Sequence, residues 1–443
     1  MQPITRDLVQ FLTALKQKDL SAEVVDRARY LLLDYLGVVT RGSREASSQT
    51  VYRMVERAGV TGPCTIIGTP LRTSAEYAAL ANGAAAHSIE LDDTHQAGSI
   101  HLGVVMYPTA IALSEHLPGV TPDRFFTAVV AGYEAAARIA MAVRPKDHYA
   151  LGFHPTATCG VFGSAITAGK LLGLDEDRML WATGIAGSMA AGLLEFLGDG
   201  SWTKRLHPGL AAKNGIQAAM LAAEGFRGPS TVLEGNNGFL SAYSRKPDFD
   251  AVTEDLGDSF EIMRTGVKPH ACCRYMQPGI DAIIALAKKH DLHPDKVARI
   301  EVAVLEAGWP LVCEPRGRKY RPETIVDAQF SMSFGAAVAL LYRDAALDRF
   351  TEENLRSPAI RSLMGRVVVQ KDIRIEKNFP REWRGRVTLY LADGTQLEQQ
   401  VTHPKGDPEN PLSWDELIAK FHSLGGSKPN IPILLDSLQH SEV

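Results

Sequence analysis

The sequence predicts a mainly α protein with a large all-helical domain and a smaller, inserted α+β domain. Two observations lead to this fold class. Apolar residues recur at the three- and four-residue spacing of helices from Thr5 to about Arg264, and after Gly266 the pattern changes to the alternation typical of strands. The chain has 443 residues, which is enough for two domains with a substantial buried core.

The N-terminal part reads as a series of packed helices. Apolar side chains between Val24 and Val39 predict one long helix, with Ser21 as its N-cap. Further helices are expected over 46–58, 74–88, 121–143, 157–172, 176–197 and 209–225. Several of them are rich in Ala and Gly, so their backbones can approach closely. We therefore expect a dense helical bundle.

The later part combines strands with helices. The stretches ARIEVAVL and GRVTLYL alternate at period two, and Asp393-Gly394 predicts a hairpin turn between GRVTLYL and TQLEQQV. Helices are expected over 275–289, 324–342 and 351–364, and Ser413 caps a final helix, WDELIAKFHSL. The predicted domains are 1–265, completed by the tail 403–443, and 266–402.

Composition excludes several classes of protein. Lys and Arg number 47 against 51 Asp and Glu, for a net charge of -4, so we expect neither nucleic acid nor an anionic membrane as a partner. The 5 cysteines include one close pair, the adjacent Cys272 and Cys273, which suits neither a disulfide framework nor a zinc site. The N-terminus does not resemble a signal peptide, and no apolar run approaches ~18 residues. A cytoplasmic location is expected.

The first candidate site is the segment HSIELDDTH, residues 87–95, followed by His101. Asp93 or His101 could act as a base in proton transfer. Asp and His are also metal ligands, and a further alternative is that these residues cap the helix or are polar side chains at the surface. Because no H-E-x-x-H or related ligand spacing is present, we expect no metal here.

Two further clusters each precede a helical pattern. His154 in GFHPT comes just before Pro155, which suits a first helical turn, so its imidazole could meet a substrate anion there or simply cap the helix. The segment DGSWTKRLHPG contains Lys204, Arg205 and His207, which could form a carboxylate receptor or a solvated basic turn.

The fourth cluster, VKPHACCR, lies at the predicted domain junction. Lys268 could clamp an anion or donate a proton there. Cys272 and Cys273 are expected to behave as small buried side chains, because no further matched pair could complete a metal cluster. No G-x-G-x-x-G after a strand, no P-loop and no G-x-S-x-G motif is found, so no nucleotide cofactor is expected.

In order along the chain, LDDTH, HLG, GFHPT, DGSWTKRLHPGLAAKNG, VKPHACCR and HPKGDPENPLS make the sequence resemble the MmgE/PrpD family over nearly its whole length. That family includes 2-methylcitrate dehydratase, cis-aconitate decarboxylase and iminodisuccinate epimerase. The resemblance implies a large helical domain with a smaller α+β domain, a homodimer, and catalysis with no metal or organic cofactor.

The resemblance also implies an active site in a cleft between the domains. The catalytic residues expected there are Asp93, His101, His154, Lys204 and Lys268. The residues expected to bind substrate are Arg205, His207, His270, Arg274 and Phe334. The sequence departs from the family pattern twice: Phe334 replaces a Tyr of many relatives, and His101 is followed by Leu where many have Pro.

These observations predict a cofactor-independent lyase or isomerase that removes a proton next to a carboxylate of a small di- or tricarboxylate. Dehydration of the 2-methylcitrate type is the default reaction, with epimerisation and decarboxylation as alternatives. A non-catalytic carboxylate-binding dimer is the alternative from another class. The two classes differ in whether Asp93 and His101 face the same cleft as Lys204 and Lys268.

Overall fold

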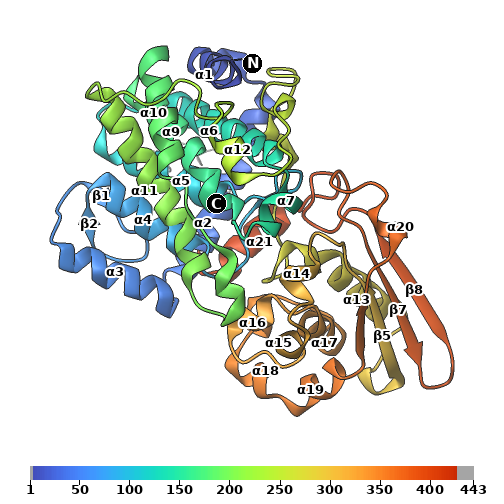
Figure 1. The fold of residues 1–443 in the computed structure, drawn as a ribbon. Coiled ribbons are helices and arrows are strands. Elements are labelled where there is room, and N and C mark those ends of the chain that lie inside the picture. Colours follow the sequence, from blue (N-terminus) through green and yellow to red (C-terminus); the bar gives the residue numbers. More distant parts are fainter. Residues whose placement is uncertain (1–2, 427–443) are drawn as a thin grey trace.

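The computed structural model describes residues 3–426. It consists of a large helical domain and a smaller domain that carries a four-stranded sheet, lying side by side (Figure 1). The predicted fold class is therefore confirmed. The part of the predicted tail beyond residue 426 lies outside the described residues.

The large domain is built from helices that surround the three central helices α5, α9 and α11. Its helices are α1 (Ile4–Ala14), α2 (Ala22–Gly42), α3 (Ala46–Ala58), α4 (Ala75–Ala86), α5 (Gly103–His116), α6 (Pro122–Ala142), α7 (Pro145–Ala150), α8 (Pro155–Thr158), α9 (Gly160–Leu172), α10 (Glu176–Ser188), α11 (Thr203–Ala223) and α12 (Phe239–Tyr243). Two small ribbons accompany them: β1 (Cys64–Thr65) with β2 (Arg72–Thr73), and β3 (Thr94–His95) with β4 (Thr265–Gly266).

Glycines allow α4 and α11 to cross at close range. A Cβ on Gly209 of α11 would lie 2.2 Å from the carbonyl oxygen of Leu80 on α4, and a Cβ on Gly83 would lie 2.8 Å from the Cα of Gly209. Only glycine fits at such a contact, because real Cβ atoms do not approach this closely. The start of α11 is thus held against α4, near the loop that leaves α4.

Helix α6 is long and apolar enough to cross a membrane by length and composition, although the sequence pattern led us to expect no such run. In the fold, 94% of its most apolar window is buried inside the large domain. Its buried Glu134 and Arg138 form an ion pair at 2.6 Å. The helix is therefore placed as a core helix.

The small domain places helices beside its sheet (Figure 1). The sheet order is β6-β5-β7-β8, with β5 and β6 parallel and the other pairs antiparallel. Its elements are α13 (Gln277–Lys289), β5 (Val297–Ala303), α14 (Trp309–Val312), α15 (Arg316–Lys319), α16 (Ile325–Gln329), α17 (Met332–Tyr342), α18 (Glu352–Arg356), α19 (Pro358–Met364), β6 (Val367–Gln370), α20 (Ile373–Glu376), β7 (Gly385–Leu391) and β8 (Gln396–Val401). The predicted hairpin is confirmed as β7–β8, with Gly394 at φ 90 in its turn.

The last described helix, α21 (Trp414–Ser423), returns to the large domain. Its Lys420 donates hydrogen bonds to the Asp34 carboxylate on α2 at 2.6 Å and to the carbonyl of Leu91 at 2.8 Å. The second of these bonds reaches the loop after α4, so α21 supports the segment that carries the first candidate cluster.

Several predicted boundaries differ from the structure. The helix expected over 209–225 begins at Thr203, and the one expected over 176–197 ends at Ser188. Pro208 led us to begin the first of these helices too late, but α11 continues through it. As a result, Lys204, Arg205 and His207 lie in the first turns of a helix and not in a turn before it.

Candidate active site

The loop between α4 and α5 is buried along almost its whole length. Glu90, near its start, has a φ of 56, a backbone conformation that side chains other than glycine rarely adopt. Strained backbone of this kind persists only where the surrounding structure holds it, and it is common at functional sites. Here the conformation places the Glu90 carboxylate between two lysine side chains.

Four buried charged groups form one ionic network. The Lys204 ammonium contacts the Glu90 carboxylate. Lys268 lies 3.5 Å from Glu90 Oε2 and 3.3 Å from Asp92 Oδ1. Burial acts to raise the pKa of Glu90, but the two lysines lower it to about 2. Burial acts to lower the pKa of Lys268, but Asp92 and Glu90 raise it. The two lysines are therefore matched by two ionised carboxylates.

His101 is oriented by the backbone of the same loop. Its Nδ1 lies 2.7 Å from the carbonyl oxygen of Asp93, which can only accept a hydrogen bond, so the proton is on Nδ1 and Nε2 carries the free lone pair. Burial lowers the pKa of His101 to about 3. The imidazole is thus neutral and can act as a hydrogen-bond acceptor or base through Nε2.

The Asp93 carboxylate is held by hydrogen bonds to the large domain and lies apart from the ionic network. It accepts hydrogen bonds from the backbone N–H of Gly103, at 2.9 and 3.1 Å, and from the Tyr133 hydroxyl at 2.7 Å. Burial raises its pKa to about 7. These contacts fix the start of α5, and the carboxylate is not among the groups that line the cavity described below.

His154, at the start of α8, stands opposite His207 on α11, with 3.0 Å between their Nδ1 atoms. One of these two Nδ1 atoms must carry a proton and donate it in a hydrogen bond to the other Nδ1. Burial lowers the pKa of His154 well below its usual value and that of His207 to about 3. The pair is therefore uncharged at neutral pH.

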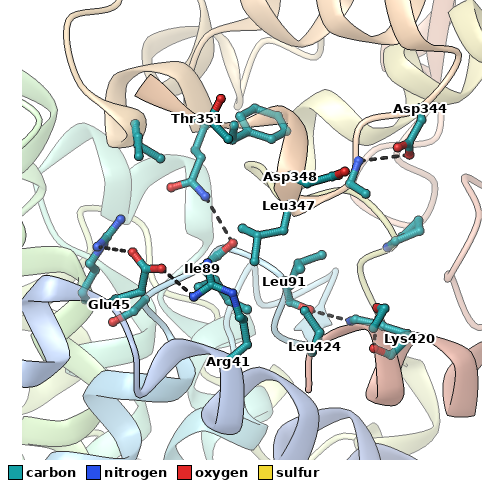
Figure 2. Close-up of a pocket in the computed structure, with 18 of the residues that line it drawn as sticks. Arg41, Glu45, Ile89, Leu91, Asp344, Leu347, Asp348, Thr351, Lys420 and Leu424 are labelled. Atoms are coloured by element: carbon teal, nitrogen blue, oxygen red, sulfur yellow. Dashed lines mark hydrogen bonds and ion pairs between the residues drawn. The ribbon is translucent and has the colours of Figure 1, made fainter. Parts of the chain in front are cut away.

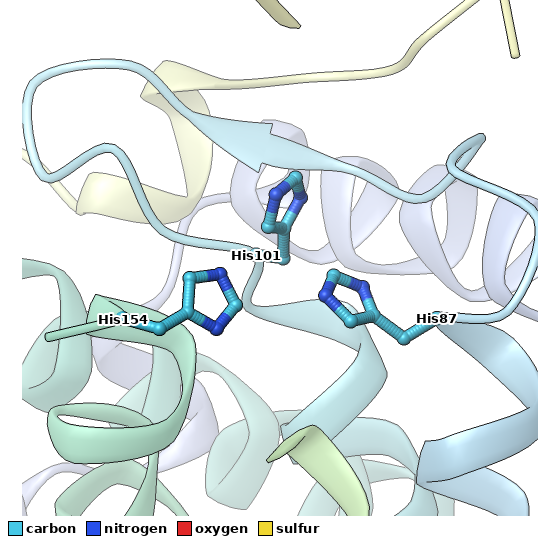
Figure 3. A group of neighbouring side chains, drawn as sticks. All are labelled: His87, His101 and His154. Carbon is cyan, nitrogen blue, oxygen red and sulfur yellow. The ribbon is translucent and has the colours of Figure 1, made fainter. Parts of the chain in front are cut away.

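Three imidazoles gather at the centre of this region (Figure 3). The ligand atoms of His87, His101 and His154 all lie within 4.8 Å of one another, which is a grouping that could hold a metal ion. His87 donates from Nδ1 to Asp92 Oδ2 at 2.7 Å, and its buried Nε2 has no hydrogen-bond partner. The sequence led us to expect no metal, because no H-E-x-x-H or related ligand spacing is present.

A small cavity at the domain boundary is lined by several of these groups. Its volume is about 30 Å³, enough for a water molecule or two. The large domain contributes Glu90, Thr94, Ser99, His101, Tyr149, His154, Leu194, Phe196 and Lys204. The small-domain side contributes Cys273, Arg274, Tyr275, Leu311, Phe330 and Trp383.

Of the remaining residues predicted to bind substrate, Arg274 lines the cavity, and Arg205, His270 and Phe334 do not. Arg274 lines the cavity and is paired with Asp407. Arg205 points to the other side of the loop, where it donates to the Ser47 hydroxyl at 3.0 Å. His270 Nε2 lies 2.8 Å from Asp281 Oδ1, away from the cavity. Phe334 packs against Phe350, with ring centroids 5.6 Å apart, and does not line the cavity.

A second and much wider cleft, of about 740 Å³, lies on the far side of the loop (Figure 2). Ser88, Ile89 and Leu91 line this cleft, whereas Glu90 between them lines the inner cavity. Its basic residues are engaged by neighbours, as in the 2.8 Å contact between Arg41 and Glu45. The chemically active groups thus converge on the small inner cavity and not on the larger cleft.

Sequence reasoning missed Glu90 and Asp92 as site residues, although it singled out their segment. The sequence of a loop does not show on which face of the loop each acidic side chain lies. The direction depends on the positive φ at Glu90 and on Lys268, which comes from a distant part of the chain. Of the predicted bases, His101 shares the cavity with Lys204, and Lys268 joins them through Glu90.

Comparisons with known proteins identify the family of both domains. Residues 6–252 match the MmgE/PrpD N-terminal domain, and residues 270–429 match the MmgE/PrpD C-terminal domain. The chain is 30% identical to the cis-aconitate decarboxylase-like protein oryM of Aspergillus oryzae, over 96% of this chain and 91% of that protein. It is 27% identical to the cis-aconitate decarboxylase of Aspergillus terreus, over 96% and 89% of the two chains. It is 26% identical to the human cis-aconitate decarboxylase, over 96% of this chain and 88% of that protein. The chain belongs to the MmgE/PrpD family.

Proposed function

We propose that this protein is a lyase that decarboxylates cis-aconitate or a closely related tricarboxylate. The observation that carries the proposal is the small cavity between the domains, where Lys204 and the uncharged imidazoles of His101 and His154 meet. Its relatives over 96% of the chain carry the name cis-aconitate decarboxylase, which favours this reaction over the 2-methylcitrate dehydration expected by default.

Decarboxylation of cis-aconitate needs no oxidant or reductant. The bond between the substrate methylene carbon and its carboxylate breaks, and carbon dioxide leaves. The electron pair of that bond forms a new double bond to the central carbon. The former double-bond pair moves to the carbon next to another carboxylate, where it takes up one proton. The site must therefore hold anionic groups, stabilise the carbanion and supply a proton.

The residues of the cavity suit these tasks. Lys204 provides a positive charge next to the developing carbanion and a proton to transfer, while burial keeps His101 and His154 neutral. Lys268 adds positive charge from behind Glu90, at 3.5 Å from that carboxylate. Apolar side chains such as Phe196 and Phe330 exclude water, which strengthens the electrostatic interactions of the closed site.

A substrate panel followed by proton NMR tests the proposal. Citrate, 2-methylcitrate, cis-aconitate and iminodisuccinate are supplied separately, and conversion of cis-aconitate with loss of carbon dioxide is expected. Lys204→Met keeps the length and apolar stem of the side chain but removes its charge. Losing a charge-assisted hydrogen bond of roughly 1.5–3 kcal/mol lowers kcat/KM about ten- to a hundredfold.

The control is Lys213→Met, because Lys213 lies on the same helix and its ammonium stacks over Tyr77 at 5.5 Å, outside the cavity. It is expected to leave turnover unchanged. Conversion of 2-methylcitrate and not of cis-aconitate would show that the protein is a dehydratase. Binding of tricarboxylates with no conversion of any of them supports the non-catalytic binding protein.

A further inference from the structure

Trp383, in the segment between α20 and β7, is a buried side chain that neither the sequence motifs nor the mechanism above uses. It is 1% exposed and lines the inner cavity from the small-domain side. Its ring is stacked on the ring of Tyr275, with centroids 4.1 Å apart and 18° between the ring planes. A Cβ on Gly308 would lie 2.4 Å from Cγ of Tyr275, so the backbone of Gly308 packs directly against Tyr275. Packing within the small domain thus supports the indole of Trp383.

The indole N–H of Trp383 has no hydrogen-bond acceptor among residues 3–426. It is the only polar group of this side chain, and it can only donate. The N–H bond lies in the ring plane, so the stacking of the ring face on Tyr275 does not satisfy it. Phe379, a second aromatic ring near Trp383 with 6.0 Å between centroids, offers no acceptor. Because a buried donor without an acceptor destabilises a fold, the free N–H in a cavity wall indicates a ligand oxygen as its partner.

The neighbouring hydroxyls of the cavity wall, in contrast, satisfy one another. The Tyr149 hydroxyl donates to the carbonyl oxygen of Ser99 at 3.1 Å, and the Ser99 hydroxyl can then donate to the Tyr149 oxygen at 2.8 Å. The Tyr275 hydroxyl lies 3.4 Å from the Ser99 hydroxyl oxygen and can donate to it. Each hydroxyl has one proton, so these bonds use all three protons. Of these four side chains, Trp383 is the one whose donor has no acceptor in the described part of the chain.

We propose that the indole N–H of Trp383 donates a hydrogen bond to a carboxylate oxygen of the substrate, which makes Trp383 a substrate-binding residue of the small domain. Lys204 lines the same cavity from the large domain, so a polycarboxylate bound by both residues contacts both domains. A neutral donor adds affinity for an anionic oxygen without adding positive charge to a site that already buries Lys204 and Lys268. The inference rests on the proposed function only in that the ligand is a polycarboxylate.

The competing explanation is that Trp383 only fills space beside Tyr275. Two replacements separate the explanations. Trp383→Phe removes the N–H together with part of the ring surface, whereas benzothienylalanine at position 383 keeps the shape of the side chain and carries sulfur in place of the N–H. Because this second replacement removes a buried donor that has no acceptor, the benzothienylalanine protein is expected to have the melting temperature of the wild type or a higher one. A ligand role thus predicts weaker binding without lower stability.

The test uses the full chain and the non-reactive probe propane-1,2,3-tricarboxylate, with Kd measured by calorimetry. The benzothienylalanine protein is expected to bind roughly ten- to a hundredfold more weakly, the effect of one hydrogen bond to a charged group. The matched control is Trp309→Phe, since the indole N–H of Trp309, also in the small domain, already donates to the Glu314 carboxylate at 2.9 Å. It is expected to leave Kd unchanged. A wild-type Kd in the benzothienylalanine protein overturns the inference, even if Trp383→Phe weakens binding through lost packing.

NMR of the indole N–H groups gives a direct readout in the wild-type protein. The 5 tryptophans give one indole signal each, and the signal of Trp383 is identified by its absence in Trp383→Phe. Saturating tricarboxylate is expected to move the Trp383 proton signal downfield, because a hydrogen bond deshields the proton, and to leave the Trp309 signal in place. A Trp383 signal that stays in place while the probe binds overturns the inference.

Turnover separates this inference from the proposed function. With cis-aconitate as substrate, the benzothienylalanine protein is expected to show a KM raised by the same factor as Kd, while kcat falls much less. If the wild-type protein converts none of the panel acids but binds the tricarboxylate in a manner that depends on the Trp383 N–H, the proposed function fails and the inference stands. If the benzothienylalanine protein converts cis-aconitate with unchanged KM, the inference fails and the proposed function stands.

Discussion

Glu90 connects the two lysines of the large-domain side of the site, since both ammonium groups approach its carboxylate. This carboxylate balances positive charge that would otherwise be crowded into a buried space. Its removal leaves Lys204 without a carboxylate partner and Lys268 with Asp92 alone, and two positive charges near each other favour loss of a proton from one of them. The state of Lys204 and Lys268 therefore depends on Glu90.

Glu90→Gln is expected to lower kcat/KM at neutral pH at least tenfold, by about 1.4 kcal/mol or more, and to move the alkaline limb of its pH profile to lower pH. The pH profile of the variant with cis-aconitate measures both effects. Glu56→Gln, which changes an exposed glutamate on α3, is the control and is expected to behave like the wild type. A profile whose alkaline limb stays in place would show that Glu90 does not set the charge of the lysines.

The imidazoles of His87, His101 and His154 come close enough together to raise the question of a metal ion. Burial and the charge of Lys204 both lower the pKa of His87 and of His154. The burial that keeps these rings neutral also disfavours an added divalent cation, and the nearby carboxylates of Glu90 and Asp92 are already paired with Lys204 and Lys268. We therefore predict that activity survives exhaustive dialysis against EDTA, measured as turnover before and after treatment. Loss of activity that one divalent ion restores would assign the three histidines to a metal site.

At the scale of elements, the site depends on how closely α11 approaches α4. The first turns of α11 carry Lys204 and His207, and the loop that carries Glu90 leaves the end of α4. Gly209 allows the contact, because a Cβ there would meet the Leu80 carbonyl oxygen at 2.2 Å. The distance between the acidic loop and the basic helix is thus set by a helix crossing outside the cavity.

Gly209→Ala is expected to push α11 away from α4 and to lower both stability and kcat/KM, with a stability loss of about 1–3 kcal/mol from overpacking. Urea unfolding and steady-state kinetics measure the two effects. Gly317→Ala is the matched control, since Gly317 also lies in a helix and a Cβ there would meet no atom within 4 Å. If Gly209→Ala matches the control in both measurements, the close helix crossing does not position the site.

The extent to which sequence predicted these elements follows from their physical signals. Strong alternation gave the β7–β8 hairpin, and long periodic stretches gave most helices. Pro208 hid the true start of α11, because proline usually opens a helix, whereas here the helix runs through it. The short strand β6 was missed, since Val367–Gln370 is too brief to show alternation.

At the scale of the whole molecule, closing the two domains over the cavity buries several titratable groups together. Four buried histidines of the site, His87, His101, His154 and His207, all have pKa values lowered by burial. The unfolded chain binds protons on these rings at a higher pH than the folded chain does. Stability is therefore expected to fall as pH drops below about 6.5.

The raised pKa of Asp93, about 7, acts in the opposite direction, because the folded state then holds a proton that the unfolded state releases. On acidification the unfolded state gains protons on four histidines relative to the folded state, and this effect on the free energy of unfolding is larger than the opposite effect of the single aspartate. The free energy of unfolding is expected to decrease by up to roughly 4 kcal/mol for each pH unit between about pH 6.5 and 5, at about 1.4 kcal/mol for each net proton. Urea denaturation over this range checks the sign. Stability that stays level or rises on acidification would mean that these histidines are charged in the folded protein.

The central claim is that the site breaks a bond to a carboxylate of cis-aconitate and then protonates the carbon next to another carboxylate. The most direct measurement is the reaction of the wild-type protein with cis-aconitate in deuterated water, followed by NMR and carbon dioxide detection. The account predicts one deuterium in the methylene group of the dicarboxylate product for each carbon dioxide released, with both formed roughly ten- to a hundredfold more slowly in Lys204→Met. Release of carbon dioxide at the wild-type rate by Lys204→Met, or unchanged cis-aconitate with the wild-type protein, would contradict it.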